Sequence, residues 1–187
     1  MLQPSCAIVY TVSSPLFYSP EFEAIKDRAV FLPNVKLHEA GHQDALYADG
    51  YSTLRMFIRK RMNSALIDSN AIDLAATMSG GVFRELARVM RIAIDRALAD
   101  NREQILTQDV EKAAAEIRSG YWRILTSVQR ELLLTVRRTN RMDEPDKLAQ
   151  LLQMLAILEY SNGEPWCDVH PALHAMLDAL EQNPDGS

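Results

Sequence analysis

The chain has 187 residues and a net charge of −5, and 48% of its residues are hydrophobic while 24% are charged. These proportions are typical of a globular protein and exclude a wholly disordered chain. The apolar runs are too short for a membrane helix, and the acidic balance argues against strong non-specific binding to nucleic acid.

The start of the chain and its two cysteines favour a location in the cytoplasm. Residues 1–6 lack the basic region and the long apolar core of a secretory signal. Cys6 and Cys167 lie far apart in the sequence and show no metal-ligand spacing. We therefore expect free, buried thiols and a location in the reducing cytoplasm.

The first elements along the chain have the character of β-strands. Residues 7–12 form a continuous apolar and β-branched run, which predicts a strand buried on both faces. Residues 20–28 predict a short helix that begins with a proline, and residues 29–37 predict a second strand, with Pro33 at an edge or a bulge. Two strands are not stable alone, so we interpret this region as the tail of a larger sheet.

From about residue 50 the apolar residues follow the spacing of helices. Four amphipathic segments lie between residues 50 and 118, and the third runs from Val82 to about Asp100. Its apolar stripe has members spaced by four, three and four residues: Leu86, Met90, Ala93 and Ala97. The pattern predicts a small bundle of four short helices.

The last third of the chain has a different pattern. Trp122 begins one predicted amphipathic helix, and Pro145 lies at the start of a second. Asn162-Gly163 between two β-prone runs predicts a hairpin, and Pro171 opens a final helix. Helices followed by a hairpin resemble a winged helix-turn-helix.

The most informative motif lies at the junction of the second and third predicted helices, in residues 79–84 (Ser-Gly-Gly-Val-Phe-Arg). Gly80 and Gly81 allow a sharp turn, and the next helix starts almost at once. A helix start has unpaired N–H groups and the positive end of the helix dipole, so it favours an anion such as phosphate. Arg84 adds a planar cation at this place. The alternative interpretation is a solvated helix face that carries Arg84 together with neighbouring arginines.

The order of these motifs resembles the C-terminal half of an AAA+ or STAND-like P-loop ATPase, in the Orc/Cdc6-like branch. The resemblance covers about residues 5–180. It rests on an apolar strand that ends in hydroxyls, an Asp-Arg pair before the next strand, Gly-Gly-x-x-Arg on the lid, and the final hairpin. It implies a mainly α fold with a short N-terminal β remnant, a four-helix lid bundle and a C-terminal winged helix with a β-hairpin.

The resemblance also implies roles in catalysis. Thr11 or Ser13 would match sensor 1, which polarises the attacking water near the γ-phosphate. Arg28 would match the arginine finger, which reaches the nucleotide of a neighbouring subunit. Sensor 1 is often an asparagine in this family, and no asparagine ends this predicted strand.

For nucleotide binding, the resemblance implies that Gly80 and Gly81 present Arg84 as sensor 2, which contacts the γ-phosphate from the lid. No G-x-x-x-x-G-K-[ST] loop and no strand ending in an Asp-Glu pair occurs in the 187 residues. The chain alone is therefore expected not to be catalytic, and ATP with Mg would be held by the core of a parent ATPase. That core or a neighbouring subunit would be its first partner.

The resemblance divides the chain into four parts: residues 1–48 as the tail of a P-loop core, 49–118 as the helical lid, 119–182 as the winged-helix domain and 183–187 as a flexible tail. Nucleotide bound to the core would draw Arg84 inward, and the lid would then move the winged helix between docked and released states. The winged helix would bind a protein partner and so report the nucleotide state.

A second interpretation is a winged-helix regulator that binds DNA without any nucleotide. Arg137, Arg138 and Arg141 form a polar, basic loop that could contact phosphates. The helix that would enter the DNA groove is acidic at its start, and the net charge of the chain also disfavours DNA.

A third interpretation is a zinc-dependent hydrolase. The run His38-Glu39-Ala40-Gly41-His42 has the spacing of the H-E-x-x-H motif, which needs both histidines on one face of a helix. Gly41 lies inside the motif, Pro33 lies upstream, and no apolar periodicity surrounds it. We therefore expect a loop here and no metal.

Overall fold

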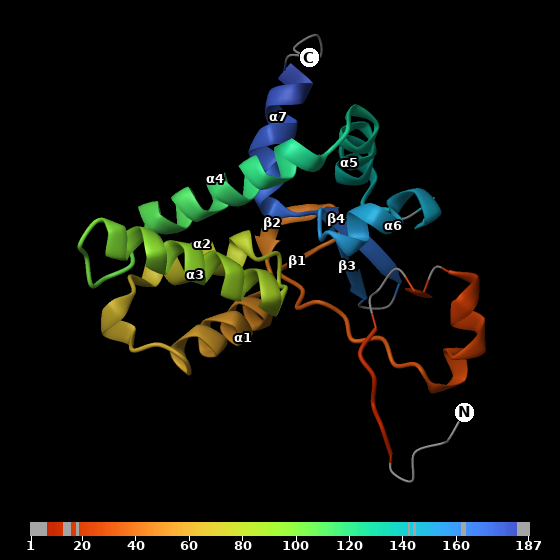
Figure 1. Ribbon diagram of the computed structural model, residues 1–187, viewed down its shortest axis with the longest axis horizontal. Coiled ribbons are helices and arrows are strands. Elements are labelled where there is room, and N and C mark those ends of the chain that lie inside the picture. Colours follow the sequence, from red (N-terminus) through yellow and green to blue (C-terminus); the bar gives the residue numbers. More distant parts are fainter. Residues whose placement is uncertain are drawn as a thin grey trace.

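The computed structural model describes residues 7–12, 16–17, 19–141, 143, 145–161 and 164–182. Within these residues the protein is mainly helical, with seven α-helices and two short antiparallel strand pairs (Figure 1). The predicted mainly α fold with small β elements is confirmed. None of the helices described has both the length and the apolar character needed to span a bilayer.

Four helices form a bundle where the sequence predicts one: α1 (Ala48–Arg59), α2 (Ser69–Met78), α3 (Phe83–Ala99) and α4 (Thr107–Ile124). The predicted stripe of α3 faces inward, and its members are at most 8% exposed. The small side chains of α4 allow it to lie close against α2 and α3 (Figure 1). All four helices contribute fully buried side chains to this core: Leu54, Ala71, Leu86, Ala93, Val110 and Ala113.

The C-terminal part follows α4 and contains α5 (Ser127–Thr139), α6 (Pro145–Gln153), β3 (Ile157–Ser161), β4 (Pro165–Val169), the 3₁₀ turn η5 (Pro171–Leu173) and α7 (His174–Gln182). Strands β3 and β4 pair antiparallel in one continuous register. The predicted hairpin is therefore present, although Asn162 and Gly163 in its turn lie outside the described residues.

One buried cluster of apolar side chains extends from the bundle into the C-terminal part. Helix α4 belongs to both, because it runs without a break through the predicted boundary between residues 118 and 119. Near its end, the Tyr121 hydroxyl donates to the Met154 carbonyl oxygen at 2.8 Å, just after α6. The division of the chain into domains stays a prediction.

The N-terminal segment differs from the prediction. Residues 7–12 are not a buried strand but an exposed, unpaired segment in which Val9 is 93% exposed. The predicted helix consists of two short 3₁₀ turns, η2 (Pro20–Ala24) and η3 (Lys26–Arg28), and residues 29–36 are not a strand either. A strand needs a neighbour for its N–H and C=O groups, and no described strand pairs with either segment.

Strands β1 (His38–Glu39) and β2 (His42–Leu46) form a hairpin where the sequence predicts a loop. Gly41 has a φ of +73°, which suits a tight turn. The H-E-x-x-H run therefore lies on two strands and not on one helix face, so the zinc-hydrolase interpretation is wrong. Among the described residues, no group of three or more metal-ligating side chains comes together.

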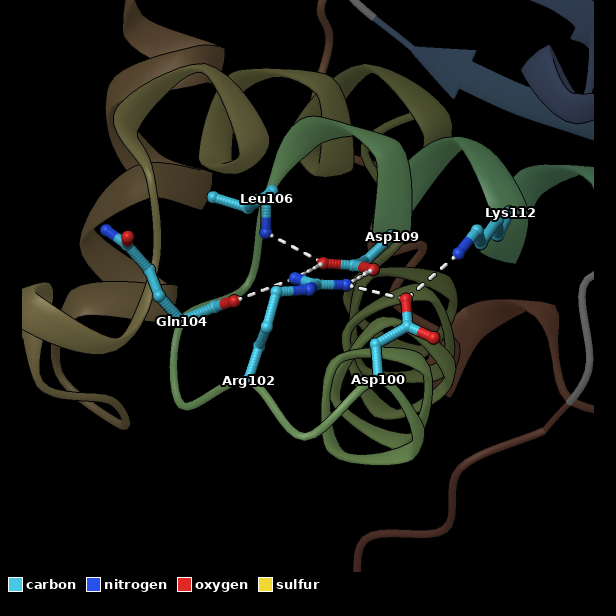
Figure 2. A network of polar contacts seen from close by, with 6 residues as sticks. All are labelled: Asp100, Arg102, Gln104, Leu106, Asp109 and Lys112. Carbon is cyan, nitrogen blue, oxygen red and sulfur yellow. Dashed lines mark hydrogen bonds and ion pairs between the residues drawn. The ribbon is translucent and has the colours of Figure 1, made fainter.

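A polar network holds the connection between α3 and α4 (Figure 2). The Arg102 guanidinium donates two hydrogen bonds to the Asp109 carboxylate, at 2.7 and 2.5 Å, and Asp109 also accepts the Leu106 N–H at 2.9 Å. Asp100 accepts hydrogen bonds from Arg102 and Lys112. Hydrogen bonding from Arg102 outweighs burial, so the pKa of the fully buried Asp109 carboxyl lies below its usual range.

Replacing Asp109 with alanine should lower the free energy of unfolding by about 2 kcal/mol, because it removes charged hydrogen bonds from a buried position. Glu116→Ala is the matched control on the same helix: its pair with Arg96 is half exposed, so the loss should be about 0.5 kcal/mol or less. Urea unfolding measures both values.

The Asp109 contribution should also depend on pH. Because the pKa of Asp109 is lowered in the folded state, the stabilisation is present above the ordinary aspartate pKa and is lost as pH falls through the lowered value. Equal losses for Asp109→Ala and Glu116→Ala at neutral pH would contradict this role of the network.

Candidate functional site

The paired glycines end α2 and lead into α3. Gly80 and Gly81 have φ values of +57° and +81°, in the left-handed region that other residues rarely adopt. The Ser79 hydroxyl donates to the Ala76 carbonyl oxygen at 2.6 Å and accepts the Gly81 N–H at 3.1 Å. The turn is therefore sharp and bonded within itself.

Gly80 lies against the C-terminal hairpin. A Cβ at Gly80 would be 2.1 Å from Cδ1 of Leu158 in β3 and 3.1 Å from Cδ of Pro171. The Tyr160 hydroxyl, also from β3, donates to the Gly80 carbonyl oxygen at 2.6 Å. A larger residue here would overlap the Leu158 side chain and would be strained by the positive φ.

Gly81 lies against the N-terminal extended segment. A Cβ at Gly81 would be 1.8 Å from the Val35 carbonyl oxygen. The Val35 N–H donates to the Gly81 carbonyl oxygen at 3.1 Å. The two glycines therefore serve two different contacts, and three segments that are far apart in the sequence meet at one turn.

Arg84 lies in the first turn of α3, and its side chain is 72% exposed. The neighbouring Glu85 is buried, and its carboxylate accepts a hydrogen bond from Arg88 at 3.2 Å. The Arg84 Nε lies 4.0 Å from the same carboxylate. The start of α3 therefore carries an exposed cation next to a buried carboxylate.

Glu85 also connects α3 with the end of the hairpin. The His170 Nε2 lies 3.5 Å from the Glu85 carboxylate, and both side chains are buried. The His170 Nδ1 accepts the Ala172 N–H at 3.1 Å, so a neutral ring carries its proton on Nε2, toward Glu85. Burial raises the pKa of the Glu85 carboxyl, but His170 and Arg88 outweigh burial and bring the net pKa below its usual range.

A cavity of about 790 Å³ lies between the bundle and the C-terminal part. At one side of it, the His38 Nε2 lies 3.3 Å from the Asp168 carboxylate, which also accepts a hydrogen bond from Gln43 at 3.0 Å. Burial lowers the pKa of His38, but the hydrogen bond to Asp168 outweighs burial, with help from Glu39, and the net pKa is raised. No motif connects His38 with Asp168, so their contact is not predictable from spacing.

The predicted catalytic residues do not gather around Arg84. Thr11 lies in the exposed segment 7–12, and Arg28 ends η3 with an exposed side chain. Ser13 lies outside the described residues. Figure 1 shows the red part of the N-terminal segment, with residues 7–12 and the turns η2 and η3, well away from α3. Within the described chain, Thr11, Arg28 and Arg84 form no common site, and their sensor and finger roles stay predictions.

The three arginines of the DNA-binding interpretation are not a free basic loop. Arg137 and Arg138 lie in the last turn of α5. Both form ion pairs with α7, Arg137 with Asp178 at 2.6 Å and Arg138 with Glu181 at 3.2 Å. Arg141 is exposed just after α5. Two of the three charges are paired within the protein, which weakens the DNA-binding interpretation.

Comparisons of this chain with family models, with curated proteins and with solved structures find no match. The geometry of the glycine turn joins an unpaired N-terminal segment, an exposed cation at a helix start and a C-terminal hairpin.

Replacing His38 with phenylalanine should destabilise the protein more at low pH than at high pH. Phenylalanine keeps a ring beside Tyr160 and Trp166 but removes the cation that pairs with Asp168. Because the pKa of His38 is raised on folding, its contribution is complete below the ordinary histidine value of 6.5 and is lost as pH rises through the raised pKa.

We expect the loss of unfolding free energy in His38→Phe to be about 1 kcal/mol near pH ~5.5 and to shrink by pH ~8.5. His42→Phe is the matched control, because His42 is exposed on the same hairpin. Urea unfolding across this pH range measures both variants. An effect of His38→Phe that does not vary with pH would contradict a charged pair with Asp168.

Proposed function

We propose that this chain is the regulatory lid and winged-helix portion of an AAA+-like P-loop ATPase, and that it couples the nucleotide state of the ATPase core to partner binding. The observation that carries the proposal is the hydrogen bond between the Val35 N–H and the Gly81 carbonyl oxygen. It joins an unpaired apolar segment to the turn that precedes α3 and its exposed Arg84.

Many apolar side chains of the N-terminal segment face solvent. Six of them are between 45% and 93% exposed: Ile8, Val9, Tyr10, Val12, Val30 and Leu32. Burying one aliphatic side chain of this size contributes about 1.5–3 kcal/mol, so the segment gains stability when another sheet covers it. Continuous apolar strands are typical of parallel sheets covered on both faces, as in P-loop cores. The exposure therefore supports docking onto such a sheet.

The place of the glycine turn supports a nucleotide near Arg84. In open α/β sheets, ligands bind beyond the carboxyl ends of the strands. If residues 29–32 pair with a core sheet, their carboxyl end leads through Pro33 to Val35, which is bonded to Gly81. A phosphate at that end of the sheet would face the start of α3.

Arg84 suits a phosphate contact better than its neighbour does. Its exposed side chain lies at the N-terminus of a helix of 17 residues, where the dipole favours an anion. Arg88, by contrast, is bonded to the buried Glu85. ATP with Mg, held by the core, would supply the phosphate, and Arg84 is the residue of this chain that would bind it.

The same turn connects Arg84 to the C-terminal part. Glu85 follows Arg84 in the chain and lies beside His170, while Tyr160 binds the Gly80 carbonyl oxygen. A rotation of α3 toward a nucleotide would move these contacts and the C-terminal part with them. This supports a role in which the nucleotide state alters how the C-terminal part binds a protein.

In the assembled ATPase, with the P-loop core on the same chain or on another subunit, Arg84→Ala should lower ATP hydrolysis by about tenfold or more. The reason is the loss of a cation from the transferred phosphate. Arg91→Ala is the matched control, since Arg91 is exposed on the same helix but farther from its start. Steady-state phosphate release measures both. Unchanged ATP hydrolysis in Arg84→Ala would contradict the proposed role of Arg84 in binding the phosphate.

Charges on the N-terminal segment should block docking onto the core without unfolding the chain. We expect Val9→Asp combined with Leu32→Asp to keep the helical circular-dichroism spectrum, because both side chains are exposed. Co-purification with the core should fall by about tenfold or more, since an unpaired carboxylate is costly to bury. Leu98→Asp is the control, at a position 63% exposed near the end of α3. Equal core binding by the double variant and the control would count against docking through this segment.

A further inference from the structure

We propose that the groove between α4 and α7 binds an acidic amphipathic helix of a partner protein. The groove has a volume of about 720 Å³, and the side chains that line it come from these two helices. The inference rests on the proposed function, which calls for a protein partner, and it names where that partner binds and what chemistry it has. Three features support it: an exposed tryptophan, two matching helical faces and uncompensated positive charge.

Trp122 provides the exposed aromatic surface of the groove. It is 45% exposed, whereas Trp166 in β4 is 6% exposed. The Arg130 guanidinium lies 3.9 Å from the centre of the Trp122 ring, and this cation–π contact orients the ring. Ile124 and Val128, just beyond in the chain, are exposed as well, each by more than half. Tryptophan and arginine dominate the binding energy of many protein interfaces, so the pair favours a protein ligand.

The two helices present the same pattern of positions to the groove: 118, 119, 122 and 123 on α4, and 175, 176, 179 and 180 on α7. Positions three and four apart lie on the same face of a helix, so each set of four covers adjoining parts of the helix surface over little more than one turn. Ser119, Ala175 and Ala179 are small and allow the backbone of a third helix to approach closely. Trp122 and Leu180 add apolar contact. The groove therefore suits a helix that lies between α4 and α7.

The charge around the groove selects an acidic occupant. The two acidic side chains of α7 are already paired with arginines of α5. Within the part of the chain that the structure describes, Arg118 and Arg123 have no ion pair, and no carboxylate lines the groove. On a chain with a net charge of −5, this is a local basic site, and carboxylates of a partner would complement it. The apolar floor favours a peptide over a nucleic acid.

A pair of synthetic peptides tests the proposal on the full chain. The probe is a capped, fluorescein-labelled helical peptide of about 18 residues, with leucines at i, i+3, i+4 and i+7 and glutamates on the other face. Its twin carries lysine in place of every glutamate. Fluorescence anisotropy should show that the acidic peptide binds about tenfold or more tightly than the twin. An unlabelled acidic peptide should shift the emission of Trp122 to shorter wavelength, over a constant contribution from the buried Trp166.

Variants test whether binding occurs in the groove. Arg118→Glu combined with Arg123→Glu should reverse the preference, so that the lysine twin binds about tenfold more tightly. Trp122→Ala should weaken both peptides by about tenfold or more. Arg91→Glu, a charge reversal on an exposed position of α3, is the matched control and should leave both affinities unchanged. Circular dichroism verifies that each variant keeps its helices.

Any of several results would overturn the proposal. They are the absence of binding by the acidic peptide, equal affinity for the two peptides, and a preference that survives the double reversal. If sedimentation velocity shows a dimer, and if Trp122→Ala dissociates that dimer, the occupant of the groove would be a second copy of the chain. If random duplex DNA competes with the acidic peptide, and if the double reversal abolishes this competition, the occupant would be a nucleic acid. None of these results changes the ATP hydrolysis expected of Arg84→Ala, so the two proposals fail separately.

Discussion

The close backbone contact at two glycines is the constraint on which the rest of the structure depends. Side chains at Gly80 and Gly81 would overlap Leu158 of the hairpin and Val35 of the N-terminal segment. Because neither position has room for a Cβ, the helical bundle approaches both segments through its backbone, and the Tyr160 hydroxyl reaches a carbonyl oxygen of the turn. The start of α3, with its exposed cation, takes its position from this contact.

Pairs of histidine and carboxylate join the C-terminal part to the bundle and to the β1–β2 hairpin, in addition to apolar packing. His170 lies beside Glu85 at one place, and His38 lies beside Asp168 at another. In both pairs, hydrogen bonding and nearby charges together outweigh burial, so the pKa of Glu85 is lowered and the pKa of His38 is raised. Such pairs are favourable only while their geometry is kept. They therefore suit an interface that has two arrangements, as the proposed coupling requires.

Local patterns predict the helices well and the N-terminal strands poorly. The apolar stripe that includes Leu86 and Ala93 is confirmed as the buried face of α3, because helix formation and burial of one face follow from residues a few positions apart. Residues 7–12 have an equally clear apolar pattern, yet they are exposed and unpaired. A strand is completed by its neighbours, so its own pattern does not determine whether it forms. The polar, basic run predicts a loop for Arg137 and Arg138, but both lie in the last turn of α5.

The sequence by itself determined the helical bundle, the C-terminal hairpin, and a glycine turn that places Arg84 at a helix start. Only the tertiary structure decided what surrounds these elements: Glu85 beside His170, His38 beside Asp168, and each glycine against a different segment. The physical reason is the range of the interactions. Helix spacing and turn chemistry act over a few residues, whereas the hydrogen bond from Tyr160 to Gly80 joins residues 80 positions apart, which only the folded chain brings together.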